Sequence, residues 1–301
     1  MTSATQLNLK QLIAMQRQVA ELAVRRKHIR SAMSGSHLSR LRGRGMEFDE
    51  VRVYQPGDDV GCIDWKVTAR KGTTHVKMYR EERERPVLLC LDYRKNMFFG
   101  TKGALKSVVA SQAAALLAWH GVQHGDRLGG LLFSDTEHFE IKPTRGRKGV
   151  LQFLHRCCSA EMWKNPRLSP DVNMPFTDMT KRLRQLSKPG SLIYILSDFR
   201  GLNESSVADL AQLARHNDVV LISVYDVIER SFPKKGVFPI FDGQSYFNIF
   251  AGQPLQSKLE TQRQENKKQI EILQKQHGLH HMELATDDDV ATRVREQLWA
   301  I

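Results

Sequence analysis

The chain has 301 residues and a formal net charge of +12, from 45 Lys and Arg against 33 Asp and Glu, and 41% of its residues are hydrophobic. This length and composition fit one large or two ordinary globular domains, and they exclude a disordered chain, a collagen-like fibre and a coiled-coil rod. The four cysteines are too few and too irregularly placed for a disulfide framework, and the absence of a Cys-x-x-Cys pair disfavours a zinc knuckle. No apolar stretch is long enough to cross a bilayer and no secretory signal is evident, so we expect a soluble, cytoplasmic protein.

The N-terminal part, residues 1–36, is predicted to be a basic helix followed by a connection. Leu, Ile, Met and Val recur at helical spacing over residues 7–30, and a Ser- and Gly-rich stretch follows. Between residues 22 and 46 there are seven basic side chains and no acidic one, and they include Arg40, Arg42 and Arg44. Such a run suits a phosphate backbone, an anionic membrane surface or an acidic protein, and it equally fits a solvated basic face.

Residues 37–85 are predicted to form a separate segment with short strands. Hydrophobic residues alternate around 48–54 and 75–80, which is typical of half-buried strands. Between these strands, Pro56-Gly57-Asp58-Asp59 is typical of a turn.

From residue 86 onward, short apolar runs alternate with helical patterns. This alternation predicts an α/β domain over 86–301, built on a doubly wound, mostly parallel sheet. The runs 128–133 and 138–141 predict a hairpin, and Asp242-Gly243 predicts the turn of a β-hairpin inserted at 230–254. The strands expected to be buried on both faces are 86–92, 191–196 and 219–225.

Two of the predicted buried strands lead into carboxylates, Asp92 and Asp198. The carboxyl ends of parallel strands meet at one edge of the sheet, where open α/β sheets bind their ligands. We expect Thr144 to follow another strand and to open a helix, which would bring it to the same edge. These three residues form the candidate site.

The string from Gly45 to Asp59, followed by Ile63-Asp64-Trp65 and Ala69-Arg70, resembles the signature of the bacterial DUF58 family. Gly61 departs from it, because the family commonly has Arg there. The resemblance covers about residues 40 to 300 and implies a von Willebrand factor A-like, Rossmann-like domain. Charges of both signs in the signature fit either a paired polar network that fixes the loop or a ligand site. The signature residues are Glu47, Arg52, Tyr54, Pro56, Gly57, Asp58, Asp59, Asp64, Trp65 and Arg70.

The resemblance also implies a place for a divalent cation, because A-like domains usually hold one through a D-x-S-x-S loop, a Thr and a later Asp. In this chain the loop is Asp92-Tyr93-Arg94-Lys95-Asn96, so both serines are replaced. A guanidinium offers no lone pair to a cation and repels it. We therefore expect no cofactor, and we hypothesise that Arg94 replaces the ion by pairing with Asp92, Asp198 or both; the alternative is that Arg94 points into solvent. Mg²⁺, if bound, would use Asp92, Asn96, Thr144 and Asp198.

No phosphate-binding loop, dinucleotide fingerprint or nucleophile-elbow motif is present in the sequence. The resemblance implies a non-enzymatic adaptor that works beside a MoxR-type AAA+ ATPase and a client protein in protein maturation or remodelling. The expected docking surfaces are the face of Asp92, Arg94, Asn96, Thr144 and Asp198 and the basic residues Arg40, Arg42 and Arg44. Two alternatives stay open: a metal-dependent hydrolase at Asp92 and Asp198, and nucleic-acid binding through residues 25–44, although no specific nucleic acid is expected.

Overall fold

The computed structural model describes residues 5–19, 46–81, 85–163, 174–230, 236–241, 246–251 and 253–298. The chain divides into two compact units, one of residues 32–84 and one that combines residues 1–31 with 85–301. The N-terminal helical residues therefore belong to the same unit as the α/β domain. No helix within the described ranges is long and apolar enough to cross a membrane.

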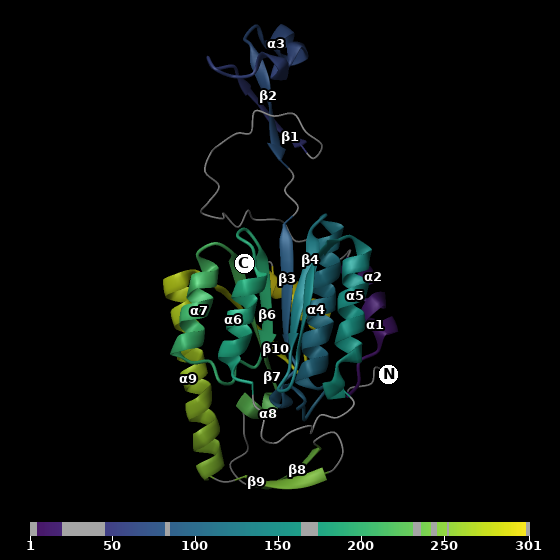
Figure 1. Cartoon of the computed structure of the whole chain (residues 1–301), viewed down its shortest axis with the longest axis vertical. Helices are drawn as coiled ribbons and strands as arrows, with labels where there is room; N and C mark the ends of the chain where they lie inside the picture. Colours follow the sequence, from purple (N-terminus) through teal and green to yellow (C-terminus); the bar gives the residue numbers. More distant parts are fainter. Residues whose placement is uncertain are drawn as a thin grey trace. The chain divides into compact units, whose positions relative to one another are not determined.

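The larger unit is built on a six-stranded sheet in the order β10-β7-β6-β3-β4-β5 (Figure 1). Its strands are parallel except for β5, which pairs antiparallel with β4. The predicted mostly parallel sheet and the predicted β4–β5 hairpin are confirmed. The strands are β3 (Pro86–Asp92), β4 (Arg127–Phe133), β5 (His138–Arg145), β6 (Leu192–Ser197), β7 (Asp218–Tyr225) and β10 (His280–Ala285).

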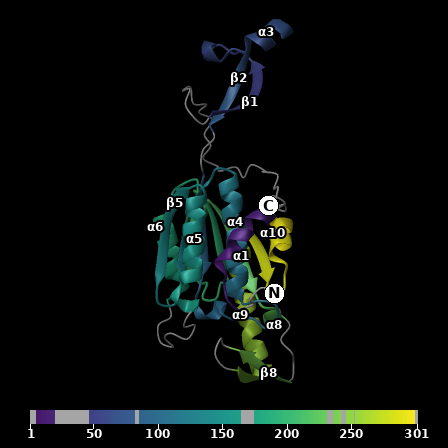
Figure 2. The same cartoon turned by 90° about the vertical axis from the view of Figure 1, so that its right-hand side faces the viewer.

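Helices cover both faces of this sheet, because its central strands are apolar on both sides. Along β3, Val87, Leu89 and Leu91 belong to one buried cluster, whereas Leu88 and Cys90 belong to the other. The first cluster is covered by α1 (Leu9–Ala14), α2 (Gln16–Val19), α4 (Lys106–Gln123), α5 (Arg147–Ser159) and α10 (Val290–Leu298). The second is covered by α6 (Phe176–Leu186), α7 (Glu204–Ala214) and α9 (Gln253–His277) (Figures 1 and 2). Short helical turns are η2 (Lys95–Met97), η3 (Glu161–Trp163) and α8 (Val227–Arg230).

The N-terminal helix is fixed to the sheet unit by α4. Trp119 Nε1 donates a hydrogen bond of 3.1 Å to the carbonyl oxygen of Leu12, and the side chains of Leu12 and Val19 are buried in the first cluster. The helix predicted over 7–30 is divided at Met15 into α1 and α2. Its continuation lies outside the described residues, and so do Arg40, Arg42 and Arg44.

The smaller unit contains the two predicted strands, β1 (Met46–Val53) and β2 (His75–Glu81), which pair antiparallel. They flank η1 (Val60–Cys62) and α3 (Trp65–Lys71). Gly57 lies in the turn after β1 with a φ of 104°, a backbone conformation that glycine adopts without a steric cost. The local sequence therefore determines this unit through turn and strand signals.

An inserted hairpin follows α8, as predicted for residues 230–254. It consists of β8 (Gly236–Phe241) and β9 (Tyr246–Ala251), paired antiparallel. The Asp242-Gly243 turn lies outside the described residues. Next along the chain is α9, whose Ile270 and Leu273 are buried against the sheet, while its N-terminal half continues beyond the sheet (Figure 1).

Candidate functional site at the carboxyl edge of the sheet

Acidic residues stand at the carboxyl ends of four adjacent parallel strands: Asp92 at the end of β3, Asp135 after β4, Asp198 after β6 and Asp226 after β7. The strand order reverses between β3 and β6, since the chain passes from β3 to β4 and β5 on one side and then crosses to β6 on the other. This switch point is where doubly wound sheets bind ligands. Asp92 and Asp198 share this edge, as the sequence predicts.

Arg94 forms a two-pronged ion pair with Asp92. Arg94 Nε donates to both carboxylate oxygens of Asp92 at 3.0 and 3.2 Å, and an Nη atom donates to Oδ2 at 2.7 Å. The backbone N–H of Arg94 and the hydroxyl of Ser197 donate to the same carboxylate at 2.9 and 2.6 Å. Asp92 has no solvent exposure. A buried carboxylate is stable only with such partners, and Arg94 is the charged one among those of Asp92.

The surroundings of Arg94 hold its guanidinium in place. Only 8% of the residue is exposed, and the guanidinium carbon lies 5.2 Å from the ring centroid of Phe176 and 6.0 Å from that of Phe133. An Nη atom also donates to the carbonyl oxygen of Arg200 at 3.0 Å. Burial alone would lower the pKa of Arg94, but the charge of Asp92 and its hydrogen bonds outweigh burial and raise it. Arg94 therefore stays charged and does not point into solvent.

A tight turn after β6 supports this arrangement. Phe199 has a φ of 54°, a left-handed conformation that is strained for a residue with a side chain. Its N–H donates to Ser197 Oγ at 2.9 Å, and its buried ring packs 5.8 Å from that of Phe176. The turn thus fixes both the Ser197 hydroxyl and the Arg200 carbonyl that contact the ion pair.

Asp198 has a different partner, Lys106, which is the first residue of α4. Lys106 is fully buried, and its Nζ donates to Asp198 Oδ2 and to Glu229 Oε1, each at 2.9 Å. Arg200 contacts the same two acids, with an Nη atom 2.8 Å from Glu229 Oε1 and Nε 3.5 Å from Asp198 Oδ2. Two bases thus balance two acids. Of the two pairings considered for Arg94, the structure has the one with Asp92.

The pKa values in this cluster follow from the competition between burial and charge. Burial would raise the pKa of Asp198, but the charges of Lys106 and Arg200 outweigh burial and lower it. Burial would lower the pKa of Lys106, but Asp198 and Glu229 outweigh it and raise the pKa. Asp198 and Lys106 are therefore both charged at neutral pH.

The other two strand-end acids hold loops at this edge. Asp135 accepts a hydrogen bond of 2.6 Å from the backbone N–H of Lys95, and burial raises the pKa of this carboxyl. Asp226 accepts hydrogen bonds from Thr101 N at 2.7 Å and Oγ1 at 2.5 Å, from Ile228 N at 3.0 Å and from Thr286 Oγ1 at 2.7 Å. Asp226 therefore ties together the loops that follow β3, β7 and β10.

The rim of the edge is open to solvent at the loop after β3. Lys95 and Asn96 are exposed on η2, whereas Arg94 before them and Met97 after them are buried. Lys95 and Asn96 thus form a short polar surface above the buried ion pair of Arg94 and Asp92.

The prediction for Thr144 is wrong. Thr144 lies within β5 and pairs with Leu128, near the start of β4, so it is at the amino end of the parallel strands. The strand continues past Pro143 because β5 is an edge strand, where a missing backbone N–H costs no ladder hydrogen bond. Asp135 is instead the residue near β4 that joins the candidate site.

The signature residues lie in the smaller unit, where several form a local polar network. Arg52 contacts Asp58 at 2.6 Å, and Asp58 also accepts from the Gln55 N–H at 2.8 Å. Asp59 and Asp64 cap η1 and α3 through their side chains. The hydrogen bond from the Val67 N–H lowers the pKa of Asp64.

The remaining signature residues do not converge on one point. Trp65 is 68% exposed, and Arg70 is exposed on the same helix, α3. Tyr54, Pro56 and Gly57 follow β1, and Glu47 lies within it. Among the described residues of this unit, the network consists of helix caps and of the ion pairs Arg52–Asp58 and Lys77–Asp64, which is a structural role.

The charged groups at the carboxyl edge give little room for a cation. Both oxygens of Asp92 accept from Arg94, and Asp198 accepts from Lys106, so a metal ion would have to displace a buried base from each. Within the described ranges, no cluster of three or more His, Cys, Asp or Glu side chains could hold a metal ion. Asn96 lies on an exposed turn, and Thr144 lies at the opposite end of the sheet. Neither is placed to complete a cation site with Asp92 and Asp198.

Four residues of this site were not predicted from the sequence: Lys106, Asp135, Arg200 and Glu229. Asp135 could have been found, since it follows a buried strand as Asp92 does. Lys106 also gave a signal, because a lysine that opens an apolar helix is unusual and charged residues are rarely buried without a partner. For Arg200 and Glu229, no sequence pattern predicts a place in the site.

Three comparisons place the chain among known proteins. Residues 50–269 match the family model described as "Protein of unknown function DUF58". The uncharacterized proteins Rv1480 of Mycobacterium tuberculosis and Mb1516 of Mycobacterium bovis are each 29% identical to it over 225 residues, which is 75% of this chain and 69% of the relative. Among solved structures, the conserved hypothetical protein BatB from Bacteroides thetaiotaomicron aligns with a TM-score of 0.46 at 12% identity, over 71% of this chain and 97% of that one.

Proposed function

The chain belongs to the DUF58 family, and from this premise we propose that it is a non-enzymatic adaptor that binds other proteins at the carboxyl edge of its sheet. Its larger unit is, on this proposal, a von Willebrand factor A-like domain that has lost its cation. The family resemblance supports a MoxR-type AAA+ ATPase as the partner, with a client protein whose maturation or remodelling the ATPase drives. The sequence contains no phosphate-binding loop, so ATP hydrolysis would be the partner's.

One observation carries the proposal: the guanidinium of Arg94 lies on Asp92, where an A-like domain would offer its carboxylate to a cation. An ion that is exchanged or shared with a ligand is thereby replaced by a fixed internal charge. The second carboxylate, Asp198, is neutralised in the same way by Lys106. What is left at the edge is a rigid, balanced platform with Lys95 and Asn96 exposed above it.

Removing the internal charge should restore a site for Mg²⁺. In Arg94→Ser the loop becomes Asp-x-Ser-x-Asn, and the oxygens of Asp92 are free to accept a hard cation. We expect the variant to bind Mg²⁺ by titration calorimetry and to melt at a higher temperature when Mg²⁺ is added. The wild-type protein should show neither effect.

Arg94→Lys is the matched control, since it shortens the side chain but keeps a positive charge beside Asp92. It should bind no Mg²⁺. Binding of Mg²⁺ by the wild type as tightly as by Arg94→Ser would contradict the replacement of the ion by Arg94.

The adaptor function itself is tested by direct binding to a MoxR-type ATPase from the same bacterium. We expect the purified full chain to form a complex with it on size exclusion, and Lys95→Glu to weaken the affinity roughly tenfold, because a charge at the rim is reversed. Lys95 is exposed, so the fold should survive the change.

Lys268→Glu is the control for this experiment, as it makes the same charge change on the exposed side of α9. It should bind the ATPase as well as the wild type does. No complex with the wild type, or equal loss in both variants, would refute docking at the carboxyl edge.

A further inference from the structure

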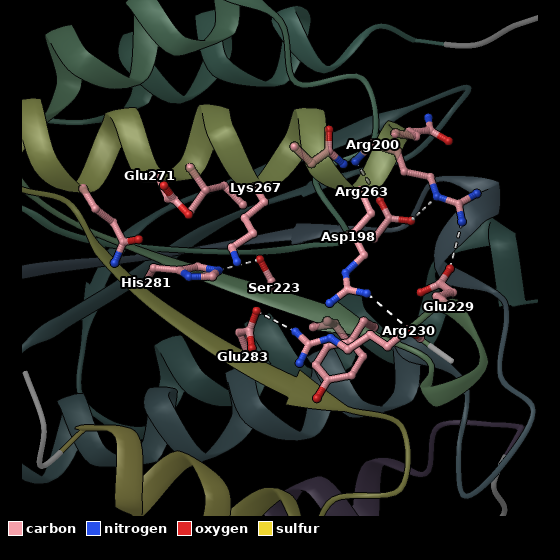
Figure 3. A pocket seen from close by; sticks show the side chains of 16 residues that line it. Asp198, Arg200, Ser223, Glu229, Arg230, Arg263, Lys267, Glu271, His281 and Glu283 are labelled. Carbon is pink, nitrogen blue, oxygen red and sulfur yellow. Dashed lines mark hydrogen bonds and ion pairs between the residues drawn. The ribbon is translucent and has the colours of Figure 1, made fainter. Parts of the chain in front are cut away.

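A polar groove of about 360 Å³ lies between α9 and the sheet, next to the site described above (Figure 3). Its floor is formed by β7 and β10, which contribute Ser223, Tyr225, His281 and Glu283. Its wall is α9, and α8 closes one end. Small-molecule sites typically have cavities of about 300–1,000 Å³, so the groove has room for a small organic molecule.

Every acid that lines the groove is already neutralised by a base. Asp198 and Glu229 share two bases, Lys106 and Arg200. Glu283 pairs with Arg230 at 2.5 Å, and Glu271 pairs with Lys275 at 3.4 Å. Further positive charges in the groove lie outside these ion pairs, although that of Arg263 also acts on Glu283 without forming an ion pair.

Two such charges are present, Arg263 and Lys267, one turn apart on α9. Neither has an ion pair with any residue that the structure describes; Arg263 makes only a hydrogen bond of 3.4 Å to the carbonyl oxygen of Arg230. Figure 3 shows both side chains extending from α9 into the groove, with Lys267 directed toward Ser223 and His281. Like charges at this spacing destabilise a helix, so an anion between them would be favoured.

The floor below Lys267 supplies a neutral donor. Ser223 Oγ and His281 Nε2 are 2.8 Å apart and share one hydrogen bond. Burial lowers the pKa of His281, so the ring is neutral at pH 7 and carries one N–H. The pair therefore has two polar hydrogens and uses one of them internally. In either tautomer, one hydrogen is left to donate to a ligand.

We propose that this groove binds a small organic molecule through a phosphate or carboxylate group, which lies between Arg263 and Lys267 and above the Ser223–His281 pair. Arginine and lysine supply charge-assisted hydrogen bonds to such an oxyanion, and the serine–histidine pair adds a neutral one. The proposal does not depend on the protein-interaction function, because it uses none of the exposed rim residues.

Titration calorimetry on the full chain with glycerol 3-phosphate and with succinate tests the proposal and distinguishes a phosphate from a carboxylate ligand. We expect millimolar or tighter binding of at least one of them at constant ionic strength. Lys267→Ala and Arg263→Ala should each weaken it about tenfold, and Ser223→Ala should weaken it less. Lys268→Ala is the matched control, since Lys268 neighbours Lys267 but does not line the groove, and it should bind as the wild type does.

Two results would overturn the inference. One is the absence of binding by either probe at millimolar concentration, with sodium chloride as the reference salt. The other is an equal loss of affinity in Lys268→Ala and Lys267→Ala, which would mean that the anion follows the net charge of α9 and not the groove. Both lysines are exposed, so thermal melting should confirm that these variants fold alike.

Discussion

Replacing Arg94 with methionine is expected to lower the free energy of unfolding by about 3–5 kcal/mol, because it leaves Asp92 as a buried charge without its counter-ion. Methionine keeps most of the packing against Phe176, so the loss reports the charge and not a cavity. Asp92 would retain only the hydrogen bonds from Ser197 and from the backbone. Urea unfolding followed by tryptophan fluorescence measures the change as a lower midpoint at an unchanged slope.

A second change separates charge from geometry. Adding Asp92→Asn to Arg94→Met removes the unpaired carboxylate, so the double variant should be more stable than Arg94→Met alone. Lys95→Met, one residue along the chain and exposed, should unfold close to the wild-type midpoint. A single variant as stable as the wild type would mean that Asp92 does not need Arg94.

Replacing Lys106 with methionine should have an effect of similar size, about 3–5 kcal/mol at pH 7, since it leaves Asp198 and Glu229 without their buried base. Arg200 still contacts both acids, but it is partly exposed and its Nε is 3.5 Å from Asp198. Lys102→Met, the same substitution at an exposed position before α4, is the control.

The loss in Lys106→Met should depend on pH in a defined direction. Lys106 helps to lower the folded-state pKa of Asp198, so the stability from Asp198 is present above its unfolded pKa of about 3.9 and disappears as the pH falls through the lower folded value. The difference between wild type and variant should therefore be largest at neutral pH and shrink near pH 3. Unfolding curves measured across this range would contradict the assignment if the difference were constant.

The same cluster limits stability at high pH. The folded-state pKa of Lys106 is raised, so its contribution is complete below the unfolded pKa of about 10.4 and is lost as the pH rises through the higher folded value. The ion pair of Lys106 and Asp198 therefore contributes to stability throughout the pH interval between their two titrations.

Local sequence patterns predict much of the fold. The run from Pro86 to Asp92 has no polar residue before its last position, which predicts a strand covered on both faces, and the structure confirms it as β3. The Asp-Gly signal correctly predicted a hairpin between 230 and 254. The edge location of Asp92 and Asp198 also followed from sequence, because all parallel strands end at the same edge.

The local sequence misled where a residue's meaning depends on its place in the sheet. The run 138–141 predicts a short strand, but β5 continues to Arg145, past Pro143, because it lies at the edge of the sheet. Thr144 lies at the far end of the sheet because β5 runs antiparallel to β4. The end of an antiparallel strand lies at the opposite edge from the ends of its parallel neighbours.

The sequence by itself predicted the sheet and the edge of the sheet at which Asp92 and Asp198 lie. It also showed an unusual arginine in the loop after β3. Only the tertiary structure decided which base neutralises which acid. Arg94 reaches Asp92 two residues away, but the partners of Lys106 are 92 and 123 residues along the chain. An ion pair depends on distances of a few ångströms between side chains. Those distances are fixed only when α4, β6 and α8 have packed against one another.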